Sequence, residues 1–527
     1  MSGDTLLRAV SAYSERVPNR DYGWQIMWRL FLAGLLTYAS CLAAQETHSH
    51  GMPEKLGEVS FPVSCNSAVQ QHFNRAVALL HSFAYAPAET AFRGVAKQDP
   101  QCAIAHWGIA MTHFHPLWEP PLPDSEIPEA KSEIKQAQRL GSGSERERKL
   151  IAALSVLLDD ASEAQYRGRA MKYLDAMTAL ARDERENLEV QVFYALALLS
   201  TASPADKTHA NQKKAADLLE PLYRVHPQHP GIPHYLIHAY DNAELASRGL
   251  AVANAYSNIA PSAPHALHMP SHIFTRLGLW DESITSNLAA RDAADRQGDT
   301  GEALHAMDYL VYAYLQSGRD PQAAEIIHQL KSKSALAGDF KSLYATTAMP
   351  VRYAVELHRW DEASAITAAS SSPPEVAAVA IWARGLGLAR RGRIEEARAQ
   401  IDRLAQIESQ LRSSGQDYWV TQTSILGREL TAWCAQQQGK PDEAVSLMRQ
   451  AADEEDAVEK LPITPGPIVP AREQLGSLLL EQNHPELALK EFQATLANAP
   501  SRLGATRGAA QAAELLKGKT ARVAAVE

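Results

Sequence analysis

The stretch HFNRAVALLHSFAYAPAETAFRGVAKQDP, residues 72–100, decides the fold class of this chain. Small alanines are spaced along it, Phe92 follows them and Pro100 closes it. Small residues let two antiparallel helices pack closely, an aromatic side chain fills the gap to the next pair, and proline ends the second helix. Residues 473–500, EQLGSLLLEQNHPELALKEFQATLANAP, carry the same pattern. The two stretches predict helical hairpins near both ends of an all-α chain.

Weaker copies of this pattern fill the interval between the two stretches. We expect about ten hairpins over residues 66–517, stacked into a right-handed superhelix, because one hairpin cannot bury its apolar face alone. A stiff, proline-rich connector is expected at 460–470, a flexible segment at 45–65 and a disordered tail at 518–527. The copies lie at 275–294, 315–330, 355–370, 389–404 and 436–451.

Residues 1–44 are expected to be an N-terminal extension and a signal peptide. Met27-Trp28-Arg29 precedes the run LFLAGLLTYASCLAAQ, and a charge followed by an apolar run and small residues is typical of a secretory signal. The run is too short to predict a transmembrane helix, so no membrane span is expected after signal removal. Between Met1 and Met27 as the start, Met27 is favoured. Export to the periplasm or the exterior is favoured over a lipid anchor at Cys41.

The composition argues against nucleic-acid binding. The 527 residues include 51 basic and 61 acidic side chains, a net charge of −10, and no basic tract of the kind that binds phosphate backbones. Four cysteines are present, none in a CxxC motif. If Cys41 leaves with the signal, Cys65 and Cys102 are a candidate disulfide in an oxidising compartment.

One pair of histidines recurs one repeat later. His234 and His238 are four residues apart, and His268 and His272 have the same spacing one helix–turn–helix repeat further along the chain. A spacing of four places two side chains on the same face of a helix. An offset of one repeat should bring the same face of the next stacked helix alongside. The four imidazoles are therefore predicted to line one groove and bind a metal ion.

Five further polar residues continue this stripe and are interpreted as additional ligands or as groups that orient the histidine rings. Packed helices lie about 8–10 Å apart, so imidazoles from two helices can meet at one ion. Imidazole and carboxylate donors without thiolate favour copper or zinc, and iron less. The five residues are Asp241, His265, His305, Asp308 and Tyr312.

Two interpretations without a metal ion stay open at this point. The polar groove could bind a peptide carboxylate or another anion through its imidazoles. Alternatively, the histidines could form an internal hydrogen-bond network that closes the superhelix without any ligand. No HExxH motif with a catalytic glutamate and no GxSxG motif is present, so the sequence offers no signature of a zinc protease or a serine hydrolase.

Six segments carry a resemblance to a known family: AVALLHSF (76–83), CAIAHWGIAM (102–111), HYLIHAYD (234–241), HALHMPSHIFTRLG (265–278), MDYLVYAYLQSG (307–318) and TPGPIVPARE (464–473). The hairpin pattern resembles that of tetratricopeptide-repeat proteins, and it covers most of the chain after the signal. More narrowly, the chain is similar to a group of large exported bacterial proteins of that type with histidine-rich concave helices. The resemblance implies a scaffold that binds a protein, a peptide or a small ligand on its concave surface.

The sequence thus predicts an exported scaffold that binds a partner or ligand in a concave, histidine-rich, metal-binding groove. The alternative is a copper- or iron-dependent oxidoreductase that uses the two histidine pairs. A metal-dependent hydrolase is a third, weaker option. Coordination separates these functions, because three protein ligands and a water favour catalysis, whereas a saturated site favours structure or storage.

Overall fold

The computed structural model describes residues 54–117, 125–141, 143–159, 166–333 and 338–524. Residues 55–527 form one compact unit. The expected signal peptide, both candidate start positions and Cys41 lie outside the described residues. Within those ranges, no helix is long and apolar enough to cross a membrane.

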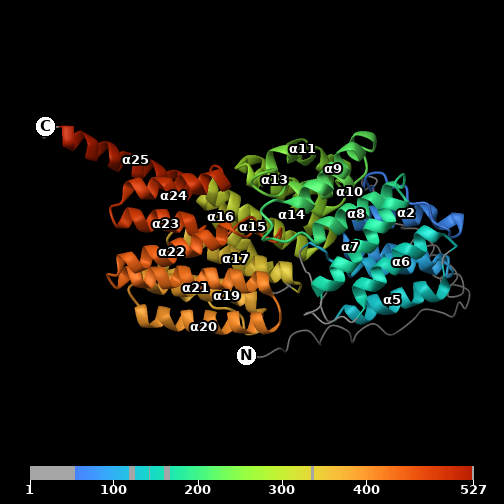
Figure 1. The fold of residues 1–527 in the computed structure, drawn as a ribbon, viewed down its shortest axis with the longest axis horizontal. Coiled ribbons are helices and arrows are strands. Elements are labelled where there is room, and N and C mark those ends of the chain that lie inside the picture. The colour runs from blue at the N-terminus through green and yellow to red at the C-terminus, as the bar shows by residue number, and fades with distance from the viewer. Residues whose placement is uncertain (1–53, 118–124, 142, 160–165, 334–337, 525–527) are drawn as a thin grey trace, which may run out of the picture. The chain divides into compact units, whose positions relative to one another are not determined.

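The described part of the chain is built of helices and contains no strand, which confirms the predicted fold class. Successive helices pack against each other as hairpins, the arrangement of a tetratricopeptide-type array (Figure 1). Its first part comprises the short 3-10 helix η1 (Ser67–Val69) and the helices α2 (Gln70–His81), α3 (Tyr85–Gln98), α4 (Ala103–Thr112), α5 (Ile127–Leu140), α6 (Glu145–Leu158), α7 (Tyr166–Asp183), α8 (Leu188–Ser200) and α9 (Ala210–Val225).

The hairpin predicted at 72–100 is formed by α2 and α3, and its aromatic residue has the expected role. A Cβ atom added at Gly108 of α4 would lie 2.4 Å from the ring of Phe92, so glycine is needed for α4 to approach α3 this closely. Phe92 is fully buried, and its ring meets that of Phe73 at 5.4 Å between centroids. Close packing at a small residue thus joins one hairpin to the next.

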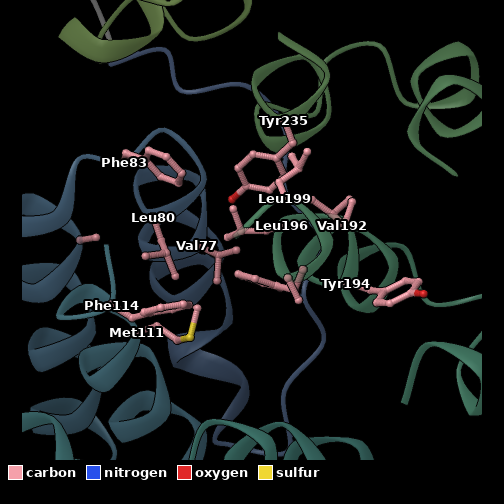
Figure 2. Close-up of a cluster of buried hydrophobic side chains, with 14 of the residues drawn as sticks. Val77, Leu80, Phe83, Met111, Phe114, Val192, Tyr194, Leu196, Leu199 and Tyr235 are labelled. Atoms are coloured by element: carbon pink, nitrogen blue, oxygen red, sulfur yellow. The ribbon is translucent and has the colours of Figure 1, made fainter. Parts of the chain in front are cut away.

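The first part of the array turns back on itself. Helix α2 packs against α10 (Gly231–Tyr240), although their contacting residues lie 154 positions apart in the chain. Figure 2 shows the buried cluster at this junction, where Val77 and Leu80 of α2 gather with Leu196 of α8 and Tyr235 of α10. The C-terminal end of α2 therefore lies beside the histidines of α10.

The middle part of the array carries the histidines, and a proline divides one of its helices. Pro270 has no main-chain N–H to donate, and the expected single helix is split there in two. Met269 keeps right-handed helical angles, φ −51° and ψ −38°, so His268 and His272 still share a face. Besides α10, this part comprises η3 (Ala246–Gly249), α11 (Leu250–Ile259), α12 (Pro264–His268), α13 (Pro270–Arg276), α14 (Trp280–Gln297) and α15 (Thr300–Gln316).

The hairpin predicted at 473–500 is formed by α23 and α24. Phe492 lies between Gly476 and Gly508, where added Cβ atoms would come within 2.8 and 2.3 Å of its ring. The last helix runs to Ala524, which contradicts the disorder expected from residue 518 up to that point. This part comprises α16 (Asp320–Lys333), α17 (Phe340–Glu356), α18 (Trp360–Ala365), α19 (Pro374–Arg390), α20 (Ile394–Ser413), α21 (Asp417–Gln437), α22 (Pro441–Asp456), α23 (Ala471–Glu481), α24 (Pro485–Asn498) and α25 (Leu503–Ala524).

Residues 55–65 are packed against the helices. Phe61 is 1% exposed, and its ring contacts that of Trp107 at 6.0 Å. The disulfide between Cys65 and Cys102 is present and ties this segment to the start of α4, which confirms the predicted pairing. The expectation of a flexible segment is wrong from residue 55 onward, because a buried aromatic side chain and a covalent bond both hold it.

Residues 457–470 connect α22 to α23 and lie across the helices that carry the histidines; this segment is called the strap. The Lys460 ammonium donates to Oδ2 of Asp241 at 2.9 Å, and the hydroxyl of Tyr309 donates to a strap carbonyl at 3.4 Å. The guanidinium of Arg352 donates to two strap carbonyls at 3.0 Å. The proline-rich connector predicted from sequence therefore also covers the groove.

Candidate metal centre

Six histidines form two adjacent groups of three. In each group, one ring nitrogen from every histidine lies within 4.8 Å of the other two. Five of the six side chains are at most 1% exposed, and His238 is partly buried. The first triad is His234, His238 and His265; the second triad is His268, His272 and His305.

Each triad combines a pair of histidines spaced four residues apart with one histidine from the first helix of the following repeat. Helix α10 carries the first pair and α12 adds His265, whereas α12 and α13 carry the second pair and α15 adds His305. The second triad therefore repeats the first one unit further along the chain. The structure gathers the histidines in threes, with His265 and His305 added to the four predicted ones, and their role as metal ligands stays a prediction.

In each triad, an uncharged acceptor binds one ring at Nδ1, the outer nitrogen; Nε2, the inner nitrogen, faces another histidine of the triad. Nδ1 of His234 faces the main-chain carbonyl of His81 at 2.5 Å, and Nδ1 of His268 faces Oδ1 of Asn287 at 2.6 Å. The amide of Asn287 is itself oriented, because its Nδ2 donates to the carbonyl of Ser283 at 2.7 Å. Both partners only accept, so each ring proton is assigned to Nδ1 and each Nε2 carries a lone pair.

Carboxylates hold the outer nitrogen of another ring in each triad. Nδ1 of His265 lies 3.2 Å from Oε2 of Glu302, and Nδ1 of His272 lies 2.8 Å from Oδ2 of Asp241. Such carboxylate–imidazole pairs fix the tautomer and orientation of metal-binding histidines and make the ring a stronger donor. Burial lowers the pKa of His272 even beside Asp241, so Nε2 of this ring also carries a lone pair.

Both carboxylates are ionised in spite of their burial. Burial raises the pKa of Asp241, but Lys460 and Arg276 outweigh it and hold that pKa well below its usual range. Burial likewise raises the pKa of Glu302, which the Lys341 ammonium holds well below its usual range. One full negative charge therefore lies at the outer edge of each triad.

The inner nitrogens converge on one another. Nε2 of His234 lies 3.2 Å from Nε2 of His265, and Nε2 of His268 lies 3.1 Å from Nε2 of His272. The contact between His268 and His272 brings together two lone pairs, so neither nitrogen can donate to the other. A cation between them removes this repulsion. Two nitrogens bound about 2.0–2.1 Å from a tetrahedral metal ion lie about 3.3 Å apart, which is close to the observed spacing.

A proton is a poor candidate for that cation. Burial, reinforced by the neighbouring imidazoles, lowers the pKa of His234, His238 and His268 well below the usual 6.5. Burial has the same effect on His305, and it lowers the pKa of His272 even beside a carboxylate. These rings are neutral at pH 7, the form that binds metal ions.

A third buried group of possible metal ligands is complementary in its own hydrogen bonds. Glu189 lies between two imidazoles, with Oε2 at 2.9 Å from Nε2 of His81 and Oε1 at 3.1 Å from Nε2 of His229. Here each nitrogen faces an acceptor, so both rings donate to the carboxylate and no further cation is needed. The two triads lack this complementarity at their centres.

The Glu189 carboxylate predicts a stability effect in acid. Burial alone raises its pKa, but the hydrogen bonds from His229 and His81 lower it from 4.5 to about 2. A lowered pKa stabilises the fold above pH 4.5, and this contribution is lost as pH falls toward 2. We expect Glu189→Gln to cost on the order of 3 kcal/mol near neutral pH, measured by urea unfolding, with the gap to wild type closing between pH 4.5 and 2. A gap independent of pH would contradict this assignment, and the part-exposed Glu133 provides a control variant with a smaller expected cost.

The two remaining sequence candidates, Asp308 and Tyr312, do not join the histidines. They occupy the positions of His268 and His272 in the next repeat but contact Arg352 of α17. Nε of Arg352 donates to Oδ1 of Asp308 at 2.9 Å, and its guanidinium lies 5.3 Å from the centre of the Tyr312 ring. Their interpretation as ligands or orienting groups is therefore corrected, because in this third copy of the motif both side chains face a guanidinium.

Several groups that shape the centre have no sequence signal of their own. Asn287 comes from the second helix of a hairpin, and Lys460 comes from the strap, 219 residues beyond its partner Asp241. The hydroxyl of Tyr309 lies 3.3 Å from Nδ1 of His272. Glu302 is the exception, because it precedes His305 by three residues and so shares its helix face.

A pocket of about 160 Å³ borders the strap, and none of the six histidines lines it. Its wall includes Arg276 and Lys460, which both contact Asp241 at 2.8 and 2.9 Å, as well as Tyr418 and Trp419. The expectation of an open histidine groove is therefore corrected. The six histidines are buried or partly buried, and this pocket lies next to the ion pairs that hold one of them.

No protein-family model matches the chain, and no curated protein matches it at a significant level. Among solved structures, the chain is similar to the Cut9–Hcn1 hetero-tetramer of the APC/C, at 13% identity over 91% of this chain and 81% of that chain, with a TM-score of 0.35. It is also similar to human IFIT1 with m7Gppp-AAAA (12% identity, 79% and 90% covered, TM-score 0.39). Yeast Tom70 is a further similar structure (10% identity, 86% and 97% covered, TM-score 0.33). Likeness at this level carries no information about function.

Proposed function

We propose that this chain binds two transition-metal ions, one in each histidine triad. The observation that carries this proposal is the pair of Nε2–Nε2 contacts at 3.2 and 3.1 Å, between rings whose Nδ1 protons are already donated outward. Neutral imidazoles held in this way are preorganised to ligate a cation. The buried carboxylate beside each triad holds the Nδ1 proton of one ring, while its charge is already balanced by lysine or arginine.

Copper is the preferred ion and zinc the next. The donors are imidazoles only, which suit copper and zinc, and at comparable sites the divalent copper ion binds most tightly. Within the described residues, the free cysteine Cys434 lies on α21, which carries none of the histidines. Three protein ligands leave one coordination position of a tetrahedral ion open. The triads therefore suit an ion that takes up a further ligand better than an ion with a purely structural role.

One observation favours a copper-dependent oxidoreductase as the second candidate function. The phenol of Tyr309 lies 3.3 Å from Nδ1 of His272, and its ring centre lies 4.7 Å from that of His268. Burial raises the pKa of Tyr309 well above 10, so the phenol keeps its proton at neutral pH. A protonated phenol beside a redox-active ion is positioned to supply a proton. Oxygen consumption by copper-loaded protein, with added ascorbate as the electron donor, that is lost in Tyr309→Phe would support this candidate; equal rates in both would contradict it.

Metal titration of the metal-free protein tests the proposed function. Copper is added against a coloured chelator of known affinity, with zinc in a parallel series. The proposal expects two equivalents per chain to be withheld from the chelator. If the protein withholds no copper from the chelator while its circular-dichroism spectrum stays helical, the proposal is contradicted. That result favours the internal hydrogen-bond network.

The acceptor that orients His268 provides a milder prediction. Replacement of Asn287 by leucine preserves the volume of a fully buried side chain but removes the acceptor of the Nδ1 proton. Loss of such an orienting partner weakens metal binding by about 10–100-fold. We expect this loss at one of the two ions in the chelator assay. Asn287→Asp keeps an acceptor and should retain tight binding; equal loss in both variants would mean that the hydrogen bond has no orienting role.

Export and the binding of a partner or ligand on the concave side are further parts of the proposal. The Cys65–Cys102 disulfide supports export, because such bonds persist in oxidising compartments. The pocket beside the strap, with aromatic and basic side chains in its wall, supports a small organic ligand there. Cell fractionation and mass analysis of the mature N-terminus test export. Trp419 fluorescence, titrated with aromatic carboxylates, tests the pocket.

A further inference from the structure

We propose that the two triads form a single dinuclear centre, in which the two metal ions share one bridging ligand taken from solvent. This inference rests on the proposed function. Its first support is spacing. Within the triads, ring centres lie 4.4–6.5 Å apart. Between the triads, His265 and His268 are 5.9 Å apart, and His238 and His272 are also 5.9 Å apart. The six rings are therefore one continuous cluster.

Helix α12 joins the two triads. Its five residues carry His265 of the first triad and His268 of the second, three positions apart on neighbouring turns of one helix face. The two ions are thus held from the same short element. Each ion keeps one open position when three imidazoles bind it. Adjacent open positions are the geometry in which one small ligand bridges two ions about 3.5–4 Å apart.

The outer contacts of the two triads match. Each triad has one ring held by a carboxylate, Glu302 or Asp241, and one ring held by a neutral acceptor, the His81 carbonyl or Asn287. Matched surroundings give the two ions similar affinities, so both positions fill together with the same metal. Two sites of unlike strength would instead fill one after the other.

The charge of the centre favours an anionic bridge. Two dications bring four positive charges, and the two carboxylates that contact the rings bring two negative ones. Each of these carboxylates is also paired with a protein cation, Asp241 with Lys460 and Glu302 with Lys341. The remaining positive charge lowers the pKa of bound water. Hydroxide is the solvent-derived ligand that both ions can share.

Electron paramagnetic resonance of the copper-loaded protein tests this inference. A hydroxide bridge couples the two unpaired electrons, so wild-type protein with two copper(II) ions should give well under half the signal of two isolated ions. The single-triad variants His265→Ala and His305→Ala should each bind one ion and give the full signal of an isolated copper(II). Two separate sites cannot explain a variant that binds one copper ion fewer than wild type and yet gives a larger resonance signal.

The alternative outcomes separate the dinuclear centre from the proposed function. Two bound ions with the full signal of both would overturn the shared bridge and leave two independent metal sites. Failure to bind copper would overturn both proposals. The wild-type measurement alone decides between coupled and independent ions, so a variant that does not fold leaves no ambiguity. His72→Ala, which removes an exposed imidazole bonded to Gln98, is the control variant.

Discussion

Replacement of His265 by alanine is expected to leave one metal ion per chain, and replacement of His305 is expected to have the same effect. Each variant removes one of three ligands from one triad and leaves the other triad complete. Substitution of a partner that only orients a metal ligand costs about 10–100-fold in affinity, and loss of a ligand should cost more. The affected ion is then lost during dialysis against a weak chelator.

The two histidines chosen for this experiment distinguish the triads from the single site predicted from sequence. If the four paired histidines formed one site, His265→Ala and His305→Ala would change affinity but not stoichiometry. The double variant should bind no metal ion, and His72→Ala should bind as many as wild type. Elemental analysis after dialysis measures all four proteins, and circular dichroism checks that each remains helical. Two ions in either single variant would contradict the assignment of ligands.

Replacement of Arg352 by methionine should destabilise the fold by about 3–5 kcal/mol. Arg352 and Asp308 are both fully buried, and removal of the guanidinium leaves the carboxyl without its ion-pair partner. Burial already raises the pKa of Asp308 against the effect of Arg352. The carboxyl therefore takes up a proton when the arginine is lost, and this protonation limits the loss of stability. The variant also loses the two hydrogen bonds from Arg352 to the strap.

Urea unfolding measures this loss of unfolding free energy, and two further variants show its cause. Combining Arg352→Met with Asp308→Leu should recover much of the stability, because a buried pair replaced by apolar side chains leaves no uncompensated charge. The exposed pair of Arg359 and Glu362 gives the control: Arg359→Met should change the free energy of unfolding far less than Arg352→Met, because exposed ion pairs contribute little. An equally small cost for Arg352→Met would show that the ion pair does not hold the strap region together.

The hairpins and the paired histidines could be predicted because both are local patterns. The small residues and Phe92 of the first hairpin, and Phe492 of the last, lie within one repeat of the residues that they contact. His234 and His238 share a helix face by their spacing alone, and the break at Pro270 did not alter that rule for the second pair. Periodicity therefore indicated the fold class and four of the six ligands in the proposed centre.

The grouping of the histidines could not be predicted, because it depends on which neighbouring helix each pair faces. The one-repeat offset aligned the two pairs with each other. The third histidine of each triad, His265 or His305, comes instead from the first helix of the following repeat. Asp308 and Tyr312 had the right spacing, yet both side chains contact Arg352 of α17 instead of the histidines. The spacing of residues along one helix does not predict which residue of another helix they will contact.

The burial of the centre was also beyond the reach of sequence patterns. The strap reaches the histidine helices from 219 residues further along the chain, where Lys460 contacts Asp241. A proline-rich stretch predicts stiffness, but it does not indicate the surface on which the stretch lies. The open groove inferred from the repeat pattern is for this reason a covered, interior site.

X-ray diffraction from crystals of the copper-loaded protein, with anomalous difference maps on both sides of the copper absorption edge, locates the bound metal ions. Two anomalous peaks are predicted, one among His234, His238 and His265 and the other among His268, His272 and His305. Each peak should lie about 2.0–2.1 Å from three imidazole nitrogens. A single peak shared by the four paired histidines, or no peak within the cluster in crystals with copper bound elsewhere, would contradict the account.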